Sequence, residues 1–297
     1  MQAITIDFRH FDTELGTWRQ AVWRPPALSH VVSAIWYLEG KLTHPRERLF
    51  PPGSAEIVVR LRGGLSSVAA EPDDRFVGAE VMGQITRAIL IDAPDERSAV
   101  LGIRLHPAGA YGVFGHPIHE LTGGSVDLAD LTAEATEQLA ERCASASSVE
   151  GLMRVAAAWV ERRASRPERP SAGVTWALAR LTEAHGTIRI ASLQSQCGMS
   201  RSRFTTAFRE QVGVAPKVFA RITRFRRALG LVRSGERALT DIALASGYYD
   251  QAHFTSEFRR ISGFTPGEFP ASRFFPASDS YMAEPGTFFQ DRAGRAP

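Results

Sequence analysis

Cysteine is scarce in this sequence, whose 297 residues contain only Cys143 and Cys197. Two cysteines cannot build a disulfide scaffold or a four-cysteine zinc site, and they favour a reducing compartment. Long apolar runs are also missing: the longest are similar to residues 31–38, far short of the roughly 20 residues of a membrane helix. The first residues show no cationic start followed by an apolar segment. We therefore expect a cytoplasmic protein that makes no use of a membrane.

Lysine is also scarce, which is unusual for a basic chain. Only Lys41 and Lys217 are present, and the other positively charged side chains are arginines. The charge is also unevenly placed. Residues 187–273 contain 14 Lys or Arg and 6 Asp or Glu, a net charge of +8, and because the whole chain carries +3 the remainder carries −5. A basic C-terminal block beside an acidic N-terminal part predicts a polyanionic partner for that block. Planar guanidinium groups suit phosphates and guanine edges.

The first 120 residues or so have no long helical pattern and are predicted to be β-rich. Short β-branched runs at 31–38, 56–61 and 98–105 are separated by clusters of Pro, Gly and Asp, which favours a small barrel or sandwich. From 127 to 163 apolar residues recur at helical spacing. The polar stretch 162–171 holds two prolines and no apolar face, so it is the best linker candidate.

The C-terminal block contains a duplication. The segments FTTAFREQVGVAPKVF (204–219) and FTSEFRRISGFTPGEF (254–269) share seven identical residues at a constant offset of 50. A short helix and a glycine-containing turn precede each copy, which predicts two helix-turn-helix units. Ser200 is predicted to cap the second helix of the first unit, and Thr240 the first helix of the second. A long helix over 216–233 joins them.

Within each unit the paired phenylalanines, four residues apart, are predicted to form the core, and the residues between them to face solvent. A recognition helix reads base edges with its N-terminal residues. The candidate base-reading residues are therefore Arg201, Ser202, Thr205, Thr206, Gln251, Ala252, Thr255 and Ser256. Arg209, Arg259 and Arg260 lie further along these helices and are the candidate phosphate contacts, which supply affinity without sequence information.

The segment 174–269 resembles the DNA-binding domain of AraC/XylS-type transcriptional regulators. The strongest match is DIALASGYYDQAHFTSEFRRISGFTPGEF (241–269), similar to that family's Ile-Ala helix, Gly-aromatic turn, Phe-x-x-x-Phe recognition helix and Gly-x-Thr-Pro close. The resemblance implies a bacterial regulator that binds double-stranded DNA with both recognition helices and recruits or blocks RNA polymerase. It also implies an N-terminal sensing or dimerising domain, often a cupin-like barrel followed by helices, so that a homodimer is expected.

The predicted fold class is accordingly α+β. An N-terminal β-rich, cupin-like barrel domain with trailing helices precedes an all-α domain of two helix-turn-helix units joined by a long helix. The predicted boundaries are a sensing or dimerisation domain at 1–163, a linker at 164–173, the DNA-binding domain at 174–271 and a loosely attached tail at 272–297. Residues 50–57 and 102–109 further resemble a less-studied N-terminal domain of regulators in this family.

If the N-terminal domain binds a small-molecule effector, aromatic and polar side chains of the barrel should contact it. The candidates are Trp18, Trp23, Trp36, Tyr37, Arg60 and Arg104. The sequence does not identify the effector. Two alternatives stay open: a regulator whose N-terminal domain makes only protein–protein contacts, and an architectural protein that tolerates many DNA sequences.

Catalytic motifs are missing, and we expect neither an enzyme nor a cofactor. There is no phosphate-binding glycine loop, nucleophile elbow or HExxH motif. His106, His116 and His119 could be interpreted as metal ligands. Because Pro117 breaks any helical spacing between the last two and no carboxylate completes the set, we interpret them as turn histidines and predict no metal site.

Overall fold

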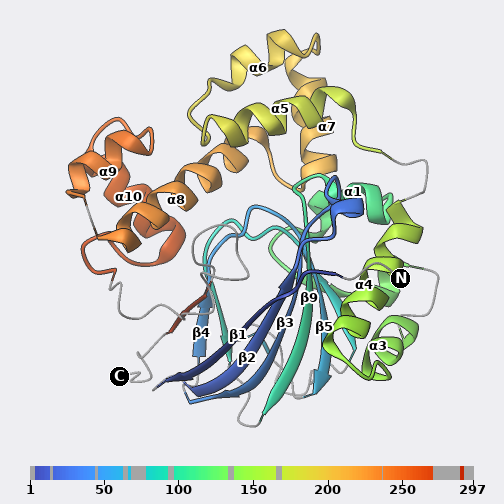
Figure 1. Cartoon of the computed structure of the whole chain (residues 1–297). Helices are drawn as coiled ribbons and strands as arrows, with labels where there is room; N and C mark the ends of the chain where they lie inside the picture. Colours follow the sequence, from blue (N-terminus) through green and yellow to red (C-terminus); the bar gives the residue numbers. More distant parts are fainter. Residues whose placement is uncertain are drawn as a thin grey trace.

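An antiparallel β-domain followed by helices forms the N-terminal part of the molecule (Figure 1). The computed structural model describes residues 4–13, 16–43, 46–62, 66–67, 78–92, 97–132, 137–164, 169–235, 237–269 and 288–290. The strands of the larger sheet are, in spatial order, β1 (Asp7–Thr13), β2 (Gly16–Trp23), β3 (Val32–Leu42), β9 (Ser98–Leu105), β5 (Glu56–Arg62), β7 (Ala79–Met82) and β10 (Ser125–Asp127). Those of the smaller sheet are β11 (Phe288–Gln290), β4 (Arg46–Leu49), β8 (Ile89–Asp92) and β6 (Ser66–Ser67).

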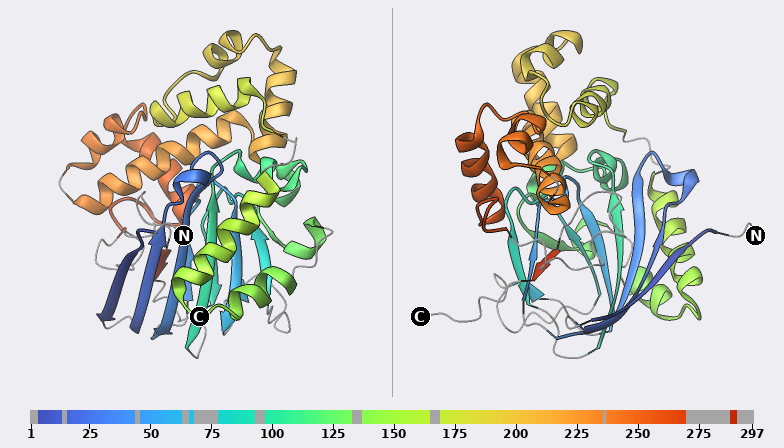
Figure 2. Two further views of the ribbon diagram at one scale, coloured as in Figure 1. Left: turned by 45° about the vertical axis from the view of Figure 1, so that its right-hand side comes forward. Right: turned by 60° about the vertical axis from the view of Figure 1, so that its left-hand side comes forward.

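The larger sheet is strongly curved, and the smaller sheet lies opposite its concave face (Figures 1 and 2). At the centre of the larger sheet, β9 pairs with β3 on one side and β5 on the other. Ile103 of β9 lies opposite Ile35 of β3 and Ile57 of β5. Side chains of a strand alternate between the two faces of a sheet. These three isoleucines therefore share the convex face, where they are fully buried in one apolar cluster with the helices that follow.

The helices of the N-terminal part cover that convex face. They are α1 (Gly109–Phe114), α2 (Leu128–Leu131), α3 (Glu137–Ala144) and α4 (Val149–Ala164), with single 3-10 turns η1 (Pro26–Leu28) and η2 (Ile118–Leu121). α4 contributes Leu152, Met153, Ala156 and Val160, which recur at helical spacing, to the apolar cluster with the sheet. Cys143 of α3 is buried there, and burial raises the pKa of its thiol to about 12, so it is an inert core residue.

The C-terminal part is helical. Its helices are α5 (Ala172–Glu183), α6 (Ile190–Gln196), α7 (Arg201–Val212), α8 (Pro216–Ser234), α9 (Leu239–Ala245) and α10 (Gln251–Ser262). α6–α7 and α9–α10 are the two predicted helix-turn-helix units, and α8 joins them as predicted. Pro216 occupies the first turn of α8, and Gly235 ends it in the left-handed conformation at φ 66°. The predicted fold class is confirmed in both parts.

The two units have separate apolar cores, each built around its pair of phenylalanines. Phe204 and Phe208 are fully buried with residues of α5 and the first half of α8. Phe254 and Phe258 are fully buried with Phe225 and other residues of the second half of α8. α8 is therefore shared, but no common core joins the two units.

Three of the sequence predictions concern the ends of elements and domains: the cap of α9, the linker and the tail. α9 begins at Leu239 with Ala238 as its N-cap, so the prediction that Thr240 caps it is wrong: an N-cap has non-helical backbone, and Thr240 lies inside the first turn. The predicted linker, 164–173, overlaps the last residue of α4 and the first two residues of α5. Residues 165–168 of it lie outside the described residues. Of the predicted loose tail, 288–290 is instead attached as β11, paired antiparallel with β4; the remainder lies outside the described residues.

Candidate nucleic-acid interface

α7 presents a polar, solvent-exposed surface over its N-terminal half. The Ser200 hydroxyl accepts a hydrogen bond from the Arg203 N–H at 3.3 Å, which starts the helix as predicted. Arg201, Ser202 and Thr206 are exposed, and Thr205 is half-buried. The structure thus brings these four predicted base-reading residues together on one accessible stretch of helix.

α10 repeats this arrangement in the second unit. The Asp250 carboxylate accepts a hydrogen bond from the His253 N–H at 2.7 Å. The four predicted readers of this unit occupy the equivalent positions: three are exposed and one is half-buried, namely Gln251, Ala252, Ser256 and, half-buried, Thr255. Because Asp250 lies 50 residues after Ser200, the duplicated sequence produces duplicated caps and duplicated faces.

The turn before α10 carries an exposed aromatic residue that the sequence analysis did not single out. Tyr249 is 88% exposed, whereas its neighbour Tyr248 is buried against Phe254 with ring centroids 5.2 Å apart. Gly247 precedes Phe254 by seven residues, but Gly198 precedes Phe204 by six. The second turn is therefore one residue longer, and that extra length was the available signal for an outward-facing side chain.

The predicted phosphate-contacting arginines lie on the last turns of the recognition helices. Arg209, Arg259 and Arg260 are all exposed, and Arg260 forms an ion pair with Glu257 at 3.4 Å. The Arg260 side chain is 64% exposed, whereas Glu257 is 14% exposed and also pairs with Arg221. All three guanidinium groups are accessible to a ligand.

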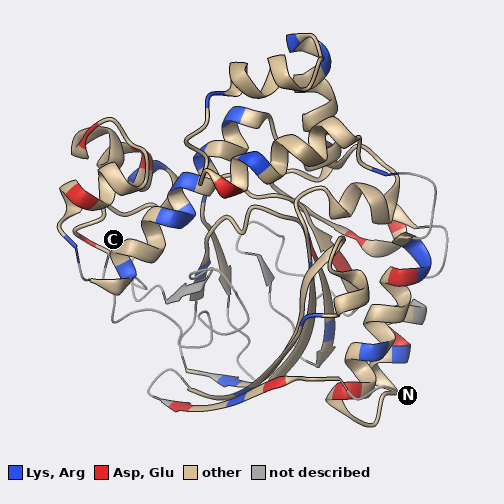
Figure 3. Ribbon diagram, turned by 45° about the horizontal axis from the view of Figure 1, so that its top comes forward, with Lys and Arg blue, Asp and Glu red and all other residues tan. Residues whose placement is uncertain are grey.

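The arginines of α8 are used differently, although they give that helix much of its positive charge (Figure 3). Arg224 donates a hydrogen bond to the Gly186 carbonyl at 2.9 Å, and Arg227 donates one to the Ala245 carbonyl at 2.8 Å. Arg221 pairs with Glu257 of α10 at 3.0 Å. These contacts hold α8 against both units. The arginine N–H groups that make them donate to backbone carbonyls and a carboxylate within the protein, and not to phosphate.

Four of the six predicted effector-contacting residues share the concave face of the larger sheet. Cross-strand register places Trp18 opposite Gly40, and Trp36 opposite Gly102. The same face carries Arg60 and Arg104, the latter opposite Glu56. The structure thus brings Trp18, Trp36, Arg60 and Arg104 together on a single buried surface.

The concave face carries buried ion pairs. Arg104 pairs with Glu56 at 3.2 Å, and the two side chains are only 8% and 3% exposed. The indole N–H of Trp36 donates to the same carboxylate at 2.5 Å. Arg60 pairs with Glu80. Both acidic partners went unpredicted, because they lie 48 and 20 residues from their arginines and only strand register joins them.

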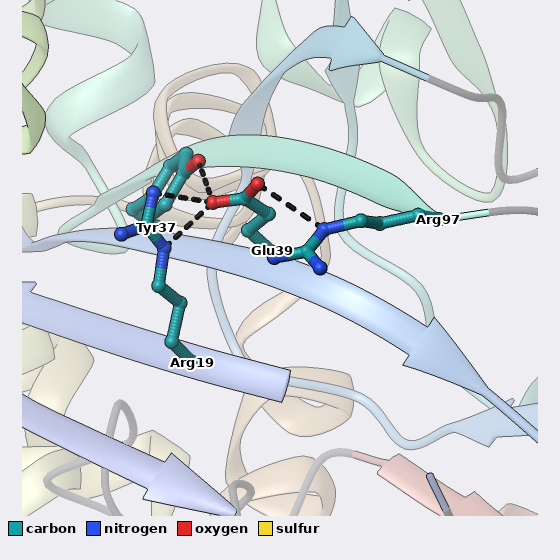
Figure 4. A network of polar contacts seen from close by, with 4 residues as sticks. All are labelled: Arg19, Tyr37, Glu39 and Arg97. Atoms are coloured by element: carbon teal, nitrogen blue, oxygen red, sulfur yellow. Dashed lines mark hydrogen bonds and ion pairs between the residues drawn. The ribbon is translucent and has the colours of Figure 1, made fainter. Parts of the chain in front are cut away.

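Trp23 and Tyr37 lie on the opposite, helix-covered face of the sheet, so the structure does not join them to the other four. The Tyr37 hydroxyl donates to the Glu39 carboxylate at 2.9 Å, and Arg19 and Arg97 pair with that same carboxylate (Figure 4). Burial and the bond to Glu39 raise the pKa of Tyr37. Burial opposes ionisation of Glu39, but the bonds from Tyr37 and Arg19 outweigh it and lower the pKa of the carboxyl.

Within the part of the chain that the structure describes, no group of three or more His, Cys, Asp or Glu side chains is arranged to hold a metal ion. His119 lies in η2, and His106 directly follows the last residue of β9. A search of the described helices for one long and apolar enough to cross a membrane finds none.

Comparison with known proteins finds family models that match the N-terminal and the C-terminal part of the chain. A family model described as a helix-turn-helix domain matches residues 193–272, and a domain of unknown function, DUF6597, matches residues 24–127. The second match includes residues 50–57 and 102–109.

Bacterial transcriptional regulators match about a quarter to a third of this chain. The F1 operon positive regulatory protein of Yersinia pestis is 33% identical over 28% of this chain and 27% of its own length. The probable transcriptional regulator LumQ of Photobacterium leiognathi is 29% identical over 27% of this chain and 32% of its own length. The matches thus span about a third of the relatives or less. Among solved structures, ToxT from Vibrio cholerae, bound to a naphthalenyl butenoic acid, aligns at 12% identity and a TM-score of 0.42 over 78% of this chain and 97% of its own.

Proposed function

Because residues 193–272 match an AraC-type helix-turn-helix domain, we propose that the protein is a sequence-specific, double-stranded DNA-binding transcription regulator. One observation carries the proposal: α7 and α10 expose equivalent polar faces over their N-terminal halves, at positions 50 residues apart. Two capped helices with accessible N-terminal turns can each enter a major groove. The net charge of +8 over 187–273 supplies attraction to phosphate.

In this function the eight candidate readers contact base edges. Gln251 can bond adenine bidentately, the hydroxyls of Ser and Thr accept several bases, and Ala252 can contact a thymine methyl. Arg209, Arg259 and Arg260 contact phosphates. The protein then recruits or blocks RNA polymerase at the promoter, in the bacterial cytoplasm.

We place control of DNA binding in the N-terminal domain, through a small-molecule effector or through homodimerisation. The concave-face tryptophans and arginines are the proposed effector contacts. The alternative is a ligand-independent regulator whose N-terminal domain makes only protein contacts. A thermal-shift screen of metabolites separates the two: a ligand-dependent rise in Tm supports the effector, and no rise with a stable dimer supports the alternative.

Replacing Gln251 by Ala is expected to cost about 1–3 kcal/mol of binding free energy on the preferred site and to relax the choice of base there. The helix cap and core are untouched because Gln251 is exposed. Binding assays on a site selected from random duplexes, beside a scrambled duplex at equal salt, measure this. An equal loss on both duplexes would show that Gln251 does not read a base.

Replacing Arg259 by Gln is expected to weaken binding to every sequence and to reduce the slope of log K against log salt by about one. The cause is the loss of one phosphate contact and its released counterion. Arg180→Gln is the matched control, since Arg180 is an exposed arginine of α5 paired with Glu183. If both variants keep the wild-type slope, Arg259 does not contact phosphate.

A further inference from the structure

The last carbonyls of both recognition helices are held by the N-terminal domain. The final carbonyls of a helix have no partner within it and carry the negative end of its dipole. At the end of α7 the Gln84 side chain donates to the Val212 carbonyl at 2.8 Å, and the Thr122 hydroxyl donates to the Gly213 carbonyl at 2.6 Å. Gln84 is completely buried. The first recognition helix is therefore fastened at its C-terminal end.

The second recognition helix is fastened at the equivalent place. The Ala88 N–H, just before β8, donates to the Ile261 carbonyl at 2.7 Å. The Arg48 guanidinium of β4 donates to the Ser262 carbonyl at 3.5 Å and lies over the Phe264 ring at 4.8 Å. Ser262 lies 50 residues after Val212, so the N-terminal domain contacts matching positions of the duplicated unit.

The glycines that follow these carbonyls permit the close approach. Gly213 and Gly263 both have left-handed backbones, with φ of 96° and 86°. A Cβ on Gly213 would lie 3.3 Å from side-chain atoms of Ile118 and Thr122, and one on Gly263 would lie 2.9 Å from an Arg48 nitrogen. A side chain at Gly213 would crowd the N-terminal domain, and one at Gly263 would require the flexible Arg48 side chain to shift.

Apolar contacts reinforce the same arrangement. Phe50 is 1% exposed and belongs to the core of the second unit, with its ring centroid 6.0 Å from that of Phe225 and 5.7 Å from that of Phe269. Ala108 belongs to the core of the first unit. Gly53 meets α8 at Arg226, 3.0 Å from the position of a Cβ. The segment 50–57 singled out in the sequence therefore includes the contact with α8 and the second unit.

We propose that the N-terminal domain sets the distance and angle between the two recognition helices, with Gln84, Thr122 and Arg48 as positioning residues, and so selects the separation between the two DNA elements that they read. This rests on the proposed function. α8 joins units with separate cores, the turn at Gly247 packs against Thr187 of the first unit, and the N-terminal domain adds a further connection that closes the arrangement. One base pair changes the separation along DNA by about 3.4 Å and the angle by roughly 34°, so a rigid pair of helices tolerates little variation.

The test removes the hydrogen-bonding groups with little change of shape. The double variant Thr122→Val, Arg48→Met loses a fastening at each helix. Thr132→Val is the matched control, because the Thr132 hydroxyl bonds the Leu128 carbonyl inside the N-terminal domain at 3.1 Å. Circular dichroism and Tm establish that both variants are folded before comparison.

The first measurement needs no DNA. Spin labels at Ser202→Cys and Ser256→Cys, in a Cys143→Ala, Cys197→Ser background, report the distance between the two recognition helices by double electron–electron resonance. The wild-type and the Thr132→Val control should give one narrow distribution, and the double variant a clearly broader one. An unchanged width in the double variant overturns the proposal, whatever the protein does with DNA.

The second measurement uses duplexes selected by the full chain, with the two elements moved apart or together by one base pair. Each shift should weaken wild-type binding about tenfold, by ~1.4 kcal/mol, and the double variant should lose most of this discrimination. Retained discrimination, or tighter binding by the variant at the preferred spacing, overturns the proposal. If the distance distribution broadens but the full chain selects no duplex, the role of the N-terminal domain in placing the helices is supported. The proposed function is then rejected.

Discussion

Replacing Phe254 by Ala is expected to unfold the second helix-turn-helix unit. Phe254 is fully buried, with its ring centroid 5.6 Å from that of Phe258 and 5.2 Å from that of Tyr248. Truncating a buried phenylalanine costs about 3–5 kcal/mol, because apolar contacts are lost and a cavity remains. That is a large fraction of the stability of a small domain. The core of this unit is small and separate from that of the first unit, although Phe50 of the N-terminal domain packs into it.

Hydrogen exchange followed by mass spectrometry measures this loss segment by segment. Protection should fall in α9 and α10 and persist in α6 and α7. Phe204→Ala is the matched variant, because Phe204 occupies the equivalent position in the first unit and is equally buried. In this variant protection should fall in α6 and α7 and persist in α9 and α10. Ser256→Ala, on the exposed face of α10, should leave both units protected. Uniform loss in both phenylalanine variants would show that the two units unfold together.

Replacing Glu56 by Gln is expected to destabilise the N-terminal domain by about 3–5 kcal/mol, since it removes the carboxylate that pairs with the buried Arg104 guanidinium. The side chains are 3% and 8% exposed and their charged atoms lie 3.2 Å apart. The amide keeps the size of the carboxylate and can still accept from the Trp36 indole. The loss therefore reports the charge and not the packing.

Urea unfolding of full-length variants measures the effect. Glu150→Gln is the control, because Glu150 pairs with Arg154 on the surface of α4 and should cost under about 1 kcal/mol. The double variant Glu56→Leu, Arg104→Met should recover much of the loss, since an apolar pair needs no counter-charge. If Glu56→Gln costs no more than Glu150→Gln, the concave-face pair does not stabilise the fold.

Local sequence was sufficient for the reading surface. A serine or aspartate before a helix, phenylalanines four apart and glycine after the last turn act over a few residues. The candidate readers consequently lie where the spacing predicts, from Arg201 to Thr206 and from Gln251 to Ser256. Their role on DNA remains a prediction.

The concave-face residues could not be assigned in the same way. Every residue of β9 is buried, so the strand has no alternation of apolar and polar positions to reveal which side chains share a face. Trp36 and Tyr37 are neighbours in sequence and both aromatic, yet they lie on opposite faces. Strand alternation places them on opposite faces, but the sequence does not indicate which of the two faces the helices cover.

The sequence by itself determined the duplicated helical units, their cores and the basic charge around them, because those features depend on contacts within a few turns of chain. The tertiary structure decided what joins distant segments. It paired Arg104 with Glu56, bound the α8 arginines to backbone carbonyls, and placed Gln84, Thr122 and Arg48 at the ends of the recognition helices. Such contacts depend on strand register and domain packing, and no local pattern encodes which donor meets which carbonyl.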